Sequence, residues 1–318
     1  LRVDLKLVLY SEYQQNLSWN LESLRKDTKR WVTYQQAVTG TTDIAPFNEW
    51  VKELVTTGYV HNHARMWFAS VWIFTFQLPW ELGADFFLRN LLDGDAASNT
   101  LAWRWVAGLH TKDKTYLATA SNIRKCSGER FADSCDFSLG LKRLATTAQP
   151  QQENLSPAAL QKTPIEWPKP LSCSLEPNTV AGLLLTEDDL CTKLPFQPSA
   201  IAALTASSRS PIAPTSELVQ QFTRGAIKDT LQRLADKSAA QVVEHALTEE
   251  EIVNWAVEQK IQQLLHPYAP SGPTQMRLLN LAPKLAARGI QLTPFMRDYD
   301  RLVWPHASKG FFQMGKQI

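Results

Sequence analysis

Polar residues recur at helical spacing within the aromatic, otherwise apolar stretch Tyr59–Trp105. Asn62, Arg65 and Met66 stand at positions i, i+3 and i+4, so a helix through this stretch places them on one face. Eight of the eleven tryptophans of the chain also lie before residue 106. The pattern predicts a helical core in which an amide, a guanidinium and a thioether face a shared space.

A second polar group follows a turn-forming triplet, Asp93–Gly94–Asp95. Asp95, Asn99 and Trp103 stand at i, i+4 and i+8, which again places them on one helix face. Removing one partner of a buried charge pair costs about 3–5 kcal/mol. We therefore expect these carboxylates and Arg65 to be buried in pairs, with each other or with a polar, flat ligand.

The segments GYVHNHARM, LPW and LLDGDAASNTLAWRW resemble the flavin-binding helical domain of the DNA photolyase/cryptochrome family. That family's motif runs GW-x-HNR-x-RM, then a Trp, then DGD-x-A-x-N-x-x-x-W-x-W, with the same spacings. The ungapped match covers roughly residues 58–105, and a looser one extends from about Trp31 to Phe131. The chain is identified as a short or N-terminally shortened member, with FAD as the expected cofactor.

The resemblance implies which residues line the flavin. Arg65 is expected to pair with Asp93 beside the ring system, and Asn99 to lie near the ring nitrogen that gains a proton on reduction. The alternative is a buried salt bridge that caps a helix. The full expected set of cofactor-binding residues is Asn62, Arg65, Asp93, Asp95, Asn99, Tyr59 and Trp103.

Trp103 and Trp80 match the inner two members of the family's tryptophan electron-transfer chain. The alternative is ordinary core packing, since indoles bury large areas. The outer member is not identified, and Trp31, Trp67 and Trp72 are the candidates. Together with Asn99 and Met66, the two matched tryptophans form the expected catalytic set.

A damaged DNA strand, with pyrimidine dimers as the lesion, is the implied partner. Tyr59, Met66 and Trp105 match positions around the pocket that receives a flipped-out lesion. Asn122 matches the family loop that contacts DNA, and Arg124 stands close to that loop's arginine position. Phosphate contacts are expected from a local basic cluster of Lys112, Lys114, Arg124, Lys125 and Arg130.

The chain also departs from the family pattern. The phosphate loop T-S-x-L-S-x-Y-L is not found upstream of the first expected helix, and the lesion-pocket Glu of an E-x-x-W-R helix is not recognisable. If Trp19 matches that Trp, Asn16 and Asn20 stand at the Glu and Arg positions. Met66 and Asn99 thus favour a light-driven pyrimidine-dimer lyase, in which reduced FAD gives an electron to the lesion. The departures favour a non-repairing cryptochrome-type photoreceptor, a flavin-binding module, or a remnant that binds no flavin.

Composition sets further limits. The chain has 318 residues with 44% hydrophobic and 10% aromatic content and a net charge of +2, so a DNA-binding face must be local. The longest apolar run, Trp67–Leu78, is too short to cross a bilayer, which predicts no membrane association. Four irregularly spaced cysteines predict reduced thiols in a cytoplasmic protein. His61 and His63 lack a third ligand in register, so no metal site is expected.

Periodicity predicts a mainly α protein, with a photolyase-like all-helical FAD-binding domain at 1–145, a Pro-rich linker at 146–175 and a small α/β domain at 176–318. The α/β part resembles a degenerate form of the family's antenna domain, which in ordinary photolyases precedes the flavin domain. No antenna chromophore and no protein partner is identified. Helices are expected at Tyr13–Tyr34, Ala45–Thr56, Asn62–Thr75, Glu81–Leu92, Ala96–Leu109, 216–235, 249–258 and Gln275–Arg288, and strands at Thr179–Leu185, Ile261–Leu265 and Ile290–Phe295, with a polar loop at Lys112–Gly140.

Overall fold

The computed structural model describes residues 7–109, 115–127, 140–149, 151, 175, 177–194, 196–205 and 208–306. They form two compact units, a helical one and an α/β one. The helical unit contains the described residues between 8 and 160 and also 209–219, whereas the α/β unit contains those between 161 and 208 and from 220 onward. The expected fold class is confirmed, while the expected domain limits stay a prediction.

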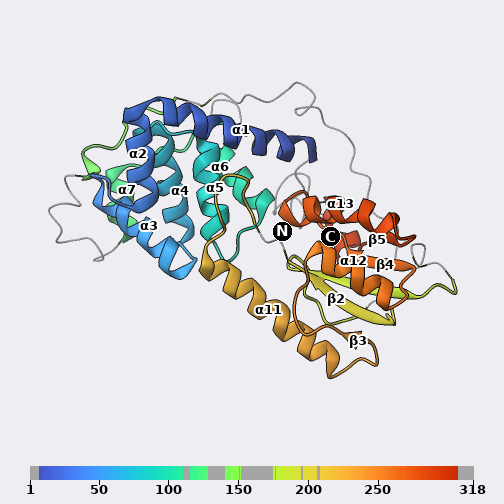
Figure 1. The fold of residues 1–318 in the computed structure, drawn as a ribbon. Coiled ribbons are helices and arrows are strands. Elements are labelled where there is room, and N and C mark those ends of the chain that lie inside the picture. The colour runs from blue at the N-terminus through green and yellow to red at the C-terminus, as the bar shows by residue number, and fades with distance from the viewer. Residues whose placement is uncertain are drawn as a thin grey trace. The chain divides into compact units, whose positions relative to one another are not determined.

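The helical unit is built around three consecutive helices, α4 (Asn62–Ser70), α5 (Trp80–Asn90) and α6 (Ala96–Val106) (Figure 1). Helix α6 packs against both α4 and α5. The core is aromatic, because the indoles and phenyl rings of these helices interlock. The surrounding elements are α1 (Leu7–Lys26), α2 (Thr28–Thr39), α3 (Ala45–Thr57), the π-helix η1 (Val71–Thr75) and α7 (Ala120–Ser127).

The expectation of a single long helix at Tyr13–Tyr34 is wrong, because the helix is interrupted at Asp27. Asp27 has an extended backbone, and its carboxylate accepts hydrogen bonds from the amides of Lys29 and Arg30, both at 3.1 Å. An Asp that caps the following helix competes with continuation of the preceding one. The expectation of a loop throughout 112–140 is also wrong, since α7 lies within it.

The α/β unit contains a five-stranded, fully parallel sheet with the order β3-β2-β1-β4-β5. A helix lies between β2 and β3, between β3 and β4 and between β4 and β5 along the chain, since parallel strands cannot be joined by a tight turn. The strands expected near β1, β4 and β5 are confirmed, whereas β2 and β3 were not expected. The elements are β1 (Ala181–Thr186), β2 (Ala200–Leu204), α11 (Glu217–Ala235), β3 (Gln241–Val242), α12 (Glu249–Glu258), β4 (Gln263–Pro267), α13 (Pro273–Ala286), β5 (Gln291–Phe295), α14 (Asp298–Val303) and the 3-10 helix η3 (Trp304–His306).

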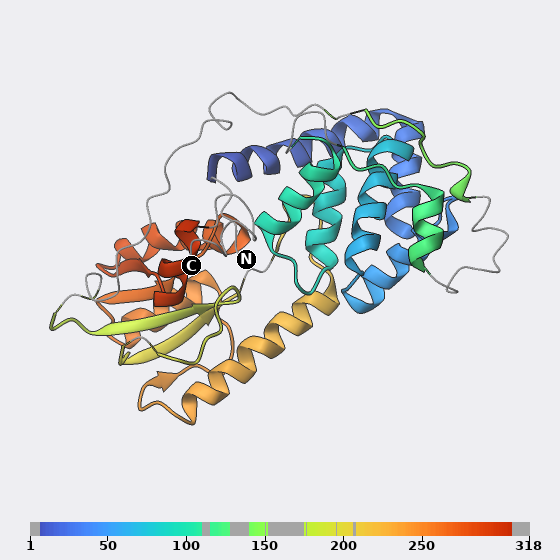
Figure 2. The same cartoon turned by 180° about the vertical axis from the view of Figure 1, so that it is seen from behind.

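Both faces of the sheet are covered, which explains why β1 is apolar at successive positions rather than alternating. Leu184 joins a core with residues of α12 and α13, and these two helices lie on one face of the sheet (Figure 2). Leu183 and Leu185 join a second core with Ile227 and Leu231 of α11 on the other face. Among the described helices, none is long and apolar enough to span a bilayer.

One carboxylate is buried at the beginning of α5. Glu81 is 5% exposed, accepts a hydrogen bond from Asn20 of α1 and lies near Arg104, whose guanidinium stacks 5.8 Å from the Trp80 ring. Desolvation raises the pKa of Glu81 from an ordinary 4.5 to about 7, against the lowering effects of the hydrogen bonds and of Arg104. Folding therefore favours the protonated form of this acid.

We expect the stability contribution of Glu81 to be complete below pH 4.5 and to be lost as the pH rises through about 7. The span between the ordinary and folded pKa corresponds to about 3 kcal/mol of unfolding free energy. Urea unfolding of wild type and Glu81→Gln across this pH range measures it, and the variant should become the more stable protein above pH 7. Glu22→Gln, at an exposed position of α1, controls for loss of a charge. If the unfolding free energies of wild type and Glu81→Gln changed with pH in parallel, Glu81 would not be the titrating group.

Candidate functional site

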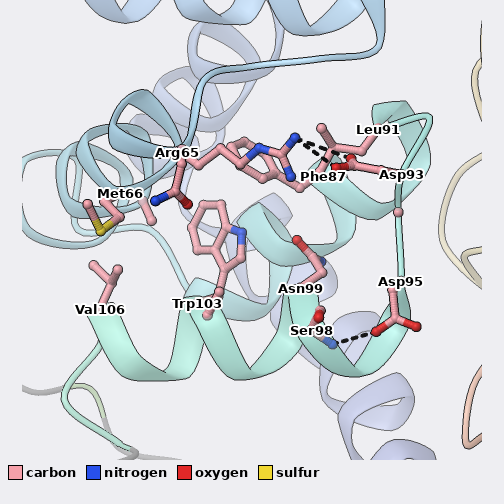
Figure 3. Close-up of a pocket in the computed structure, with 14 residues that line it drawn as sticks. Arg65, Met66, Phe87, Leu91, Asp93, Asp95, Ser98, Asn99, Trp103 and Val106 are labelled. Carbon is pink, nitrogen blue, oxygen red and sulfur yellow. Dashed lines mark hydrogen bonds and ion pairs between the residues drawn. The ribbon is translucent and has the colours of Figure 1, made fainter. Parts of the chain in front are cut away.

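A cavity of about 310 Å³ lies among α4, α5, α6 and the turn that joins α5 to α6 (Figure 3). Seven of the residues expected at the site line it: Asn62, Arg65, Met66, Asp93, Asp95, Asn99 and Trp103. The two sequence groups, one before and one after α5, thus meet in a single cavity. Helical spacing explains the convergence, because α4 and α6 each turn one polar face toward the same space.

Helix α4 begins with a histidine cap. The Nδ1 atom of His61 accepts a hydrogen bond from the His63 amide at 3.3 Å, and the ring of His61 stacks on that of His63 at 5.4 Å. This cap sets the phase of the helix, so that Asn62, Arg65 and Met66 face the cavity. His61 therefore satisfies one of the free amides at the beginning of α4.

Arg65 and Asp93 form the expected ion pair, but they do so at the cavity rim. The Nη2 atom of Arg65 lies 3.2 and 3.1 Å from the two carboxylate oxygens, and Nε donates to the Val60 carbonyl at 2.7 Å. The side chains are 25% and 59% exposed, so the expectation of a buried pair is wrong. At this exposure the pair contributes about 1 kcal/mol or less to folding, and its carboxylate stays accessible to a ligand.

The beginning of α6 is fixed by two polar side chains. Asp95 is its N-cap and accepts from the Ser98 amide at 2.7 Å, while Asn99 donates from Nδ2 to the Ala84 carbonyl of α5 at 2.7 Å. Asn99 is only 8% exposed, and its amide oxygen points into the cavity (Figure 3). The amide is thereby held in one orientation, with its acceptor presented to a bound molecule.

Trp103 forms one wall of the cavity and is 2% exposed. Its ring meets Phe87 edge-on at 5.1 Å and Trp72 at 6.2 Å. A Cβ atom at Gly83 would lie 2.3 Å from the Trp103 ring, so only glycine allows this approach. The position of the indole therefore depends on the absence of a side chain at residue 83 of α5.

Aromatic rings continue from the cavity wall to the surface. Trp103 lies 6.2 Å from Trp72, Trp72 lies 5.9 Å from Tyr34, and Tyr34 lies 5.5 Å from the part-exposed Trp31, measured between ring centroids. Trp72 lies within the π-helix η1, and its Nε1 donates to the Pro79 carbonyl at 2.9 Å.

The other tryptophans named from the sequence have different neighbours. Trp80 packs on Tyr13 at 5.8 Å. Trp67 packs on Trp50 at 5.6 Å. Two of the three candidates for an outer member, Trp31 and Trp72, thus belong to the row of rings that begins at Trp103.

The residues expected to contact DNA lie partly around the cavity and partly away from it. Tyr59 is 52% exposed under the Arg65 guanidinium, and Trp105 is 39% exposed and stacks on Tyr116. Asn122 accepts a hydrogen bond from Trp67 Nε1 at 2.9 Å, and Arg124 is exposed on α7. Lys112, Lys114 and Arg130 lie outside the described residues.

The cavity also has residues that were not expected from the sequence. Ala69 lies three positions after Met66, and Val106 lies three positions after Trp103, so helical spacing could have identified both. The residue of α5 that lines the cavity, Phe87, is apolar, so the spacing of polar residues does not identify it. The unexpected lining residues are Ala69, Phe87, Leu91, Gly94, Ser98, Ala102 and Val106.

We expect Gly83→Ala to destabilise the protein by about 1–3 kcal/mol through overpacking against Trp103. Gly225→Ala in α11 is the matched control, because a Cβ there meets nothing within 4 Å. Because alanine has a higher helix propensity than glycine, Gly225→Ala should raise the unfolding free energy by up to about 1 kcal/mol. Chemical unfolding of both variants, with near-ultraviolet circular dichroism for the indole environment, measures the difference. Equal stability of the two variants would contradict the close packing of Trp103 on Gly83.

One family model and several known proteins match parts of this chain. A family model described as the FAD binding domain of DNA photolyase matches residues 6–138. The deoxyribodipyrimidine photo-lyase of Streptomyces griseus is 41% identical over 90 residues, which is 28% of this chain and 19% of that protein. The photo-lyase of Agrobacterium fabrum is 29% identical over 158 residues, 50% of this chain and 30% of that protein. Cryptochrome DASH of Idiomarina loihiensis is 34% identical over 76 residues, 24% of this chain and 17% of that protein.

The chain spans less than a third of the length of each of these relatives. No solved structure matches it. The matched residues 6–138 contain every cavity residue described above, including the paired Arg65 and Asp93 and the Trp103 wall. Residues 6–138 of this chain are therefore similar to the FAD binding domain of DNA photolyase.

Proposed function

We propose that this protein binds FAD in the cavity of the helical unit and uses light to repair pyrimidine dimers in DNA. The observation that carries the proposal is the convergence of seven motif residues on one cavity within the matched domain. The Streptomyces and Agrobacterium relatives are deoxyribodipyrimidine photo-lyases.

The residues present fit a flavin ring system. A volume of about 310 Å³ lies at the lower end of the range of about 300–1,000 Å³ typical of ligand pockets. One wall is the flat indole of Trp103, the rim offers the accessible Asp93 carboxylate, and the Asn99 amide is fixed by Ala84. A flat heterocycle with polar edges needs this combination of an apolar wall and a few directed polar groups.

Two residues are proposed to tune the bound cofactor. Asn99 cannot rotate without breaking its 2.7 Å bond to Ala84, so its acceptor is preorganised. Arg65 is held by the Val60 carbonyl as well as by Asp93, which keeps a positive charge beside the cavity. When bound, FAD supplies the light-driven one-electron chemistry that reverts the dimer to two bases.

We propose that an electron vacancy formed at the cavity wall moves outward along a row of rings. The row consists of Trp103, Trp72, Tyr34 and Trp31. Each step joins rings whose centroids are 5.5–6.2 Å apart, and the last indole is part-exposed. An electron moves inward at each step while the vacancy moves outward, and an external thiol reduces the terminal indole. Trp80, the second member implied by the family, is retained as a competing route through Tyr13.

The lesion is proposed to enter beside Met66. Tyr59 and the stacked pair of Trp105 and Tyr116 offer exposed aromatic surface on which an extruded base can stack. Arg124 and Lys125 of α7 are exposed and offer cationic groups for phosphate contacts.

A second candidate function is a non-repairing, cryptochrome-type flavin photoreceptor. If Trp19 matches the Trp of the family's E-x-x-W-R helix, Asn16 and Asn20 stand at its Glu and Arg positions, and both are buried, at 9% and 7% exposure. The Asn20 side chain hydrogen-bonds the carboxylate of Glu81. A site without the lesion-binding carboxylate favours light sensing over repair.

We expect blue light and a thiol donor to reduce bound FAD, and Trp103→Phe or Trp72→Phe to slow this by tenfold or more, equivalent to about 1.4 kcal/mol in barrier. The reason is that phenylalanine is far harder to oxidise than tryptophan. Trp67→Phe is the control, since that indole is not a member of the row. Each variant is first checked for equal FAD content, and photoreduction is followed by visible absorbance.

Trp80→Phe separates the two routes. Slow photoreduction in Trp80→Phe with normal rates in Trp72→Phe would contradict the row proposed here and would favour the Tyr13 side.

Repair is tested by illuminating dimer-containing oligonucleotide with photoreduced, FAD-loaded protein and separating the product by chromatography. We expect weak repair, with single-stranded DNA favoured over duplex, because extrusion from a duplex costs a few kcal/mol. Binding should weaken steeply with salt if phosphate contacts contribute. No product from either strand form, with FAD demonstrably reduced, would favour the photoreceptor function.

A further inference from the structure

Helix α5 ends without a cap of its own. Its C-cap residue, Leu91, has φ −77° and ψ 130°, an extended conformation that turns the chain away and leaves the last carbonyls of the helix without intrahelical donors. A helix end inside a folded unit needs donors from elsewhere, and a positive charge there is favoured by the helix dipole.

The Gly94 amide donates to the Leu91 carbonyl at 3.2 Å, and the other donors come from far along the chain. Arg209 donates from Nη1 to the carbonyl of Leu91 at 2.9 Å and to that of Leu88 at 3.4 Å. The amide of Ser216 donates to the Arg89 carbonyl at 3.0 Å. Segment 209–219 follows β2 in sequence, yet it belongs to the helical unit.

The segment is itself ordered by local hydrogen bonds. The Arg209 amide donates to Thr215 Oγ1 at 2.9 Å, and the Ile212 amide donates to Ser210 Oγ at 3.1 Å. Ser210 also hydrogen-bonds the carboxylate of Asp85, which is 1% exposed in α5. The guanidinium is therefore held in place by a turn anchored to α5 at several points.

Arg209 lies directly behind the wall of the cavity. A Cβ atom at Gly94 would lie 2.7 Å from Nη1 of Arg209, so the guanidinium is in close contact with the turn between α5 and α6. The same turn lines the cavity through Leu91, Asp93 and Asp95. A fixed positive charge thus supports the loop that carries both carboxylates of the site.

We propose that Arg209 is a positioning residue of the cofactor cavity, which holds the Asp93–Asp95 turn in its binding conformation from behind. Its role as cofactor support rests on the proposed function of this cavity, whereas its role in ordering the turn does not. Arg209 lies outside the matched residues 6–138, so the turn that lines this cavity is supported by a segment beyond the matched residues.

The test compares Arg209→Ala, Arg209→Lys and wild type in the full chain. Arg224→Ala is the control, because its exposed guanidinium bonds only within α11, to Gln220. Hydrogen exchange of the ligand-free proteins is measured at the amides of residues 91–95 and, as an internal reference, at α12. We expect Arg209→Ala to raise exchange in the turn by about tenfold or more with α12 unchanged, a factor equivalent to about 1.4 kcal/mol.

Lysine keeps the charge and a donor but loses the planar fork, so Arg209→Lys should give an intermediate rate. If Arg209→Ala does not fold, Arg209→Lys against wild type decides the question in the same way. The proposal would be overturned if the turn of the Arg209 variants exchanged at the wild-type rate. It would also be overturned if the exchange rate rose equally in the turn and in α12.

FAD titration of the same proteins forms the second arm. We expect the Kd to rise about tenfold in Arg209→Ala and less in Arg209→Lys, with Arg224→Ala unchanged. Equal Kd values in all variants would overturn the cofactor-support role even if the turn loosens. If wild type binds no FAD, the proposed function fails, and the exchange arm still decides whether Arg209 orders the turn.

Discussion

The close approach of α5 and α6 at Gly83 is the constraint on which the site depends. A Cβ there would lie 2.3 Å from Trp103, so the indole can form the cavity wall only while residue 83 has no side chain. One residue later, the Ala84 carbonyl receives the Asn99 amide at 2.7 Å. These contacts fix the rotation of α6 about its axis, and with it the direction in which the Asp95 cap and the Asn99 acceptor face. A single steric contact and a single hydrogen bond thus orient most of the polar wall.

Ordinary core packing also produces the row of rings that leads away from the cavity. The π turn of η1 precedes a reversal of the chain, and Trp72 is fixed there by its bond to the Pro79 carbonyl. π turns are frequent at functional sites because they change which side chains face a neighbour. What distinguishes this row from a fully buried cluster is its end at Trp31, which is part-exposed and lies 5.5 Å from Tyr34.

Sequence reasoning succeeded where local physics decides structure. The helix expected at 249–258 has a complete capping box from Thr248 and Glu251, and the spacing of the DGD turn brought the cavity residues together. It failed at β2, whose Ala-rich sequence AIAAL carries a weak strand signal and becomes a strand through burial on both faces. It also failed on the exposure of Asp93, because helical spacing gives a face but not its depth.

Arg209 illustrates a limit of another kind, since its bond to Leu91 joins positions 118 residues apart in sequence. Neither periodicity nor a motif predicts such a contact, because both describe residues that are close in sequence, and Arg209 is far from α5. Closing so long a loop has an entropic cost, which the grouped contacts of Arg209, Ser210 and Ser216 help to offset. The turn between α5 and α6 is therefore held by Arg209 only when chain from beyond the first two strands has returned to α5. The stability of the cavity and the folding of the downstream chain are linked through this return, although the residues that line the cavity all lie before residue 107.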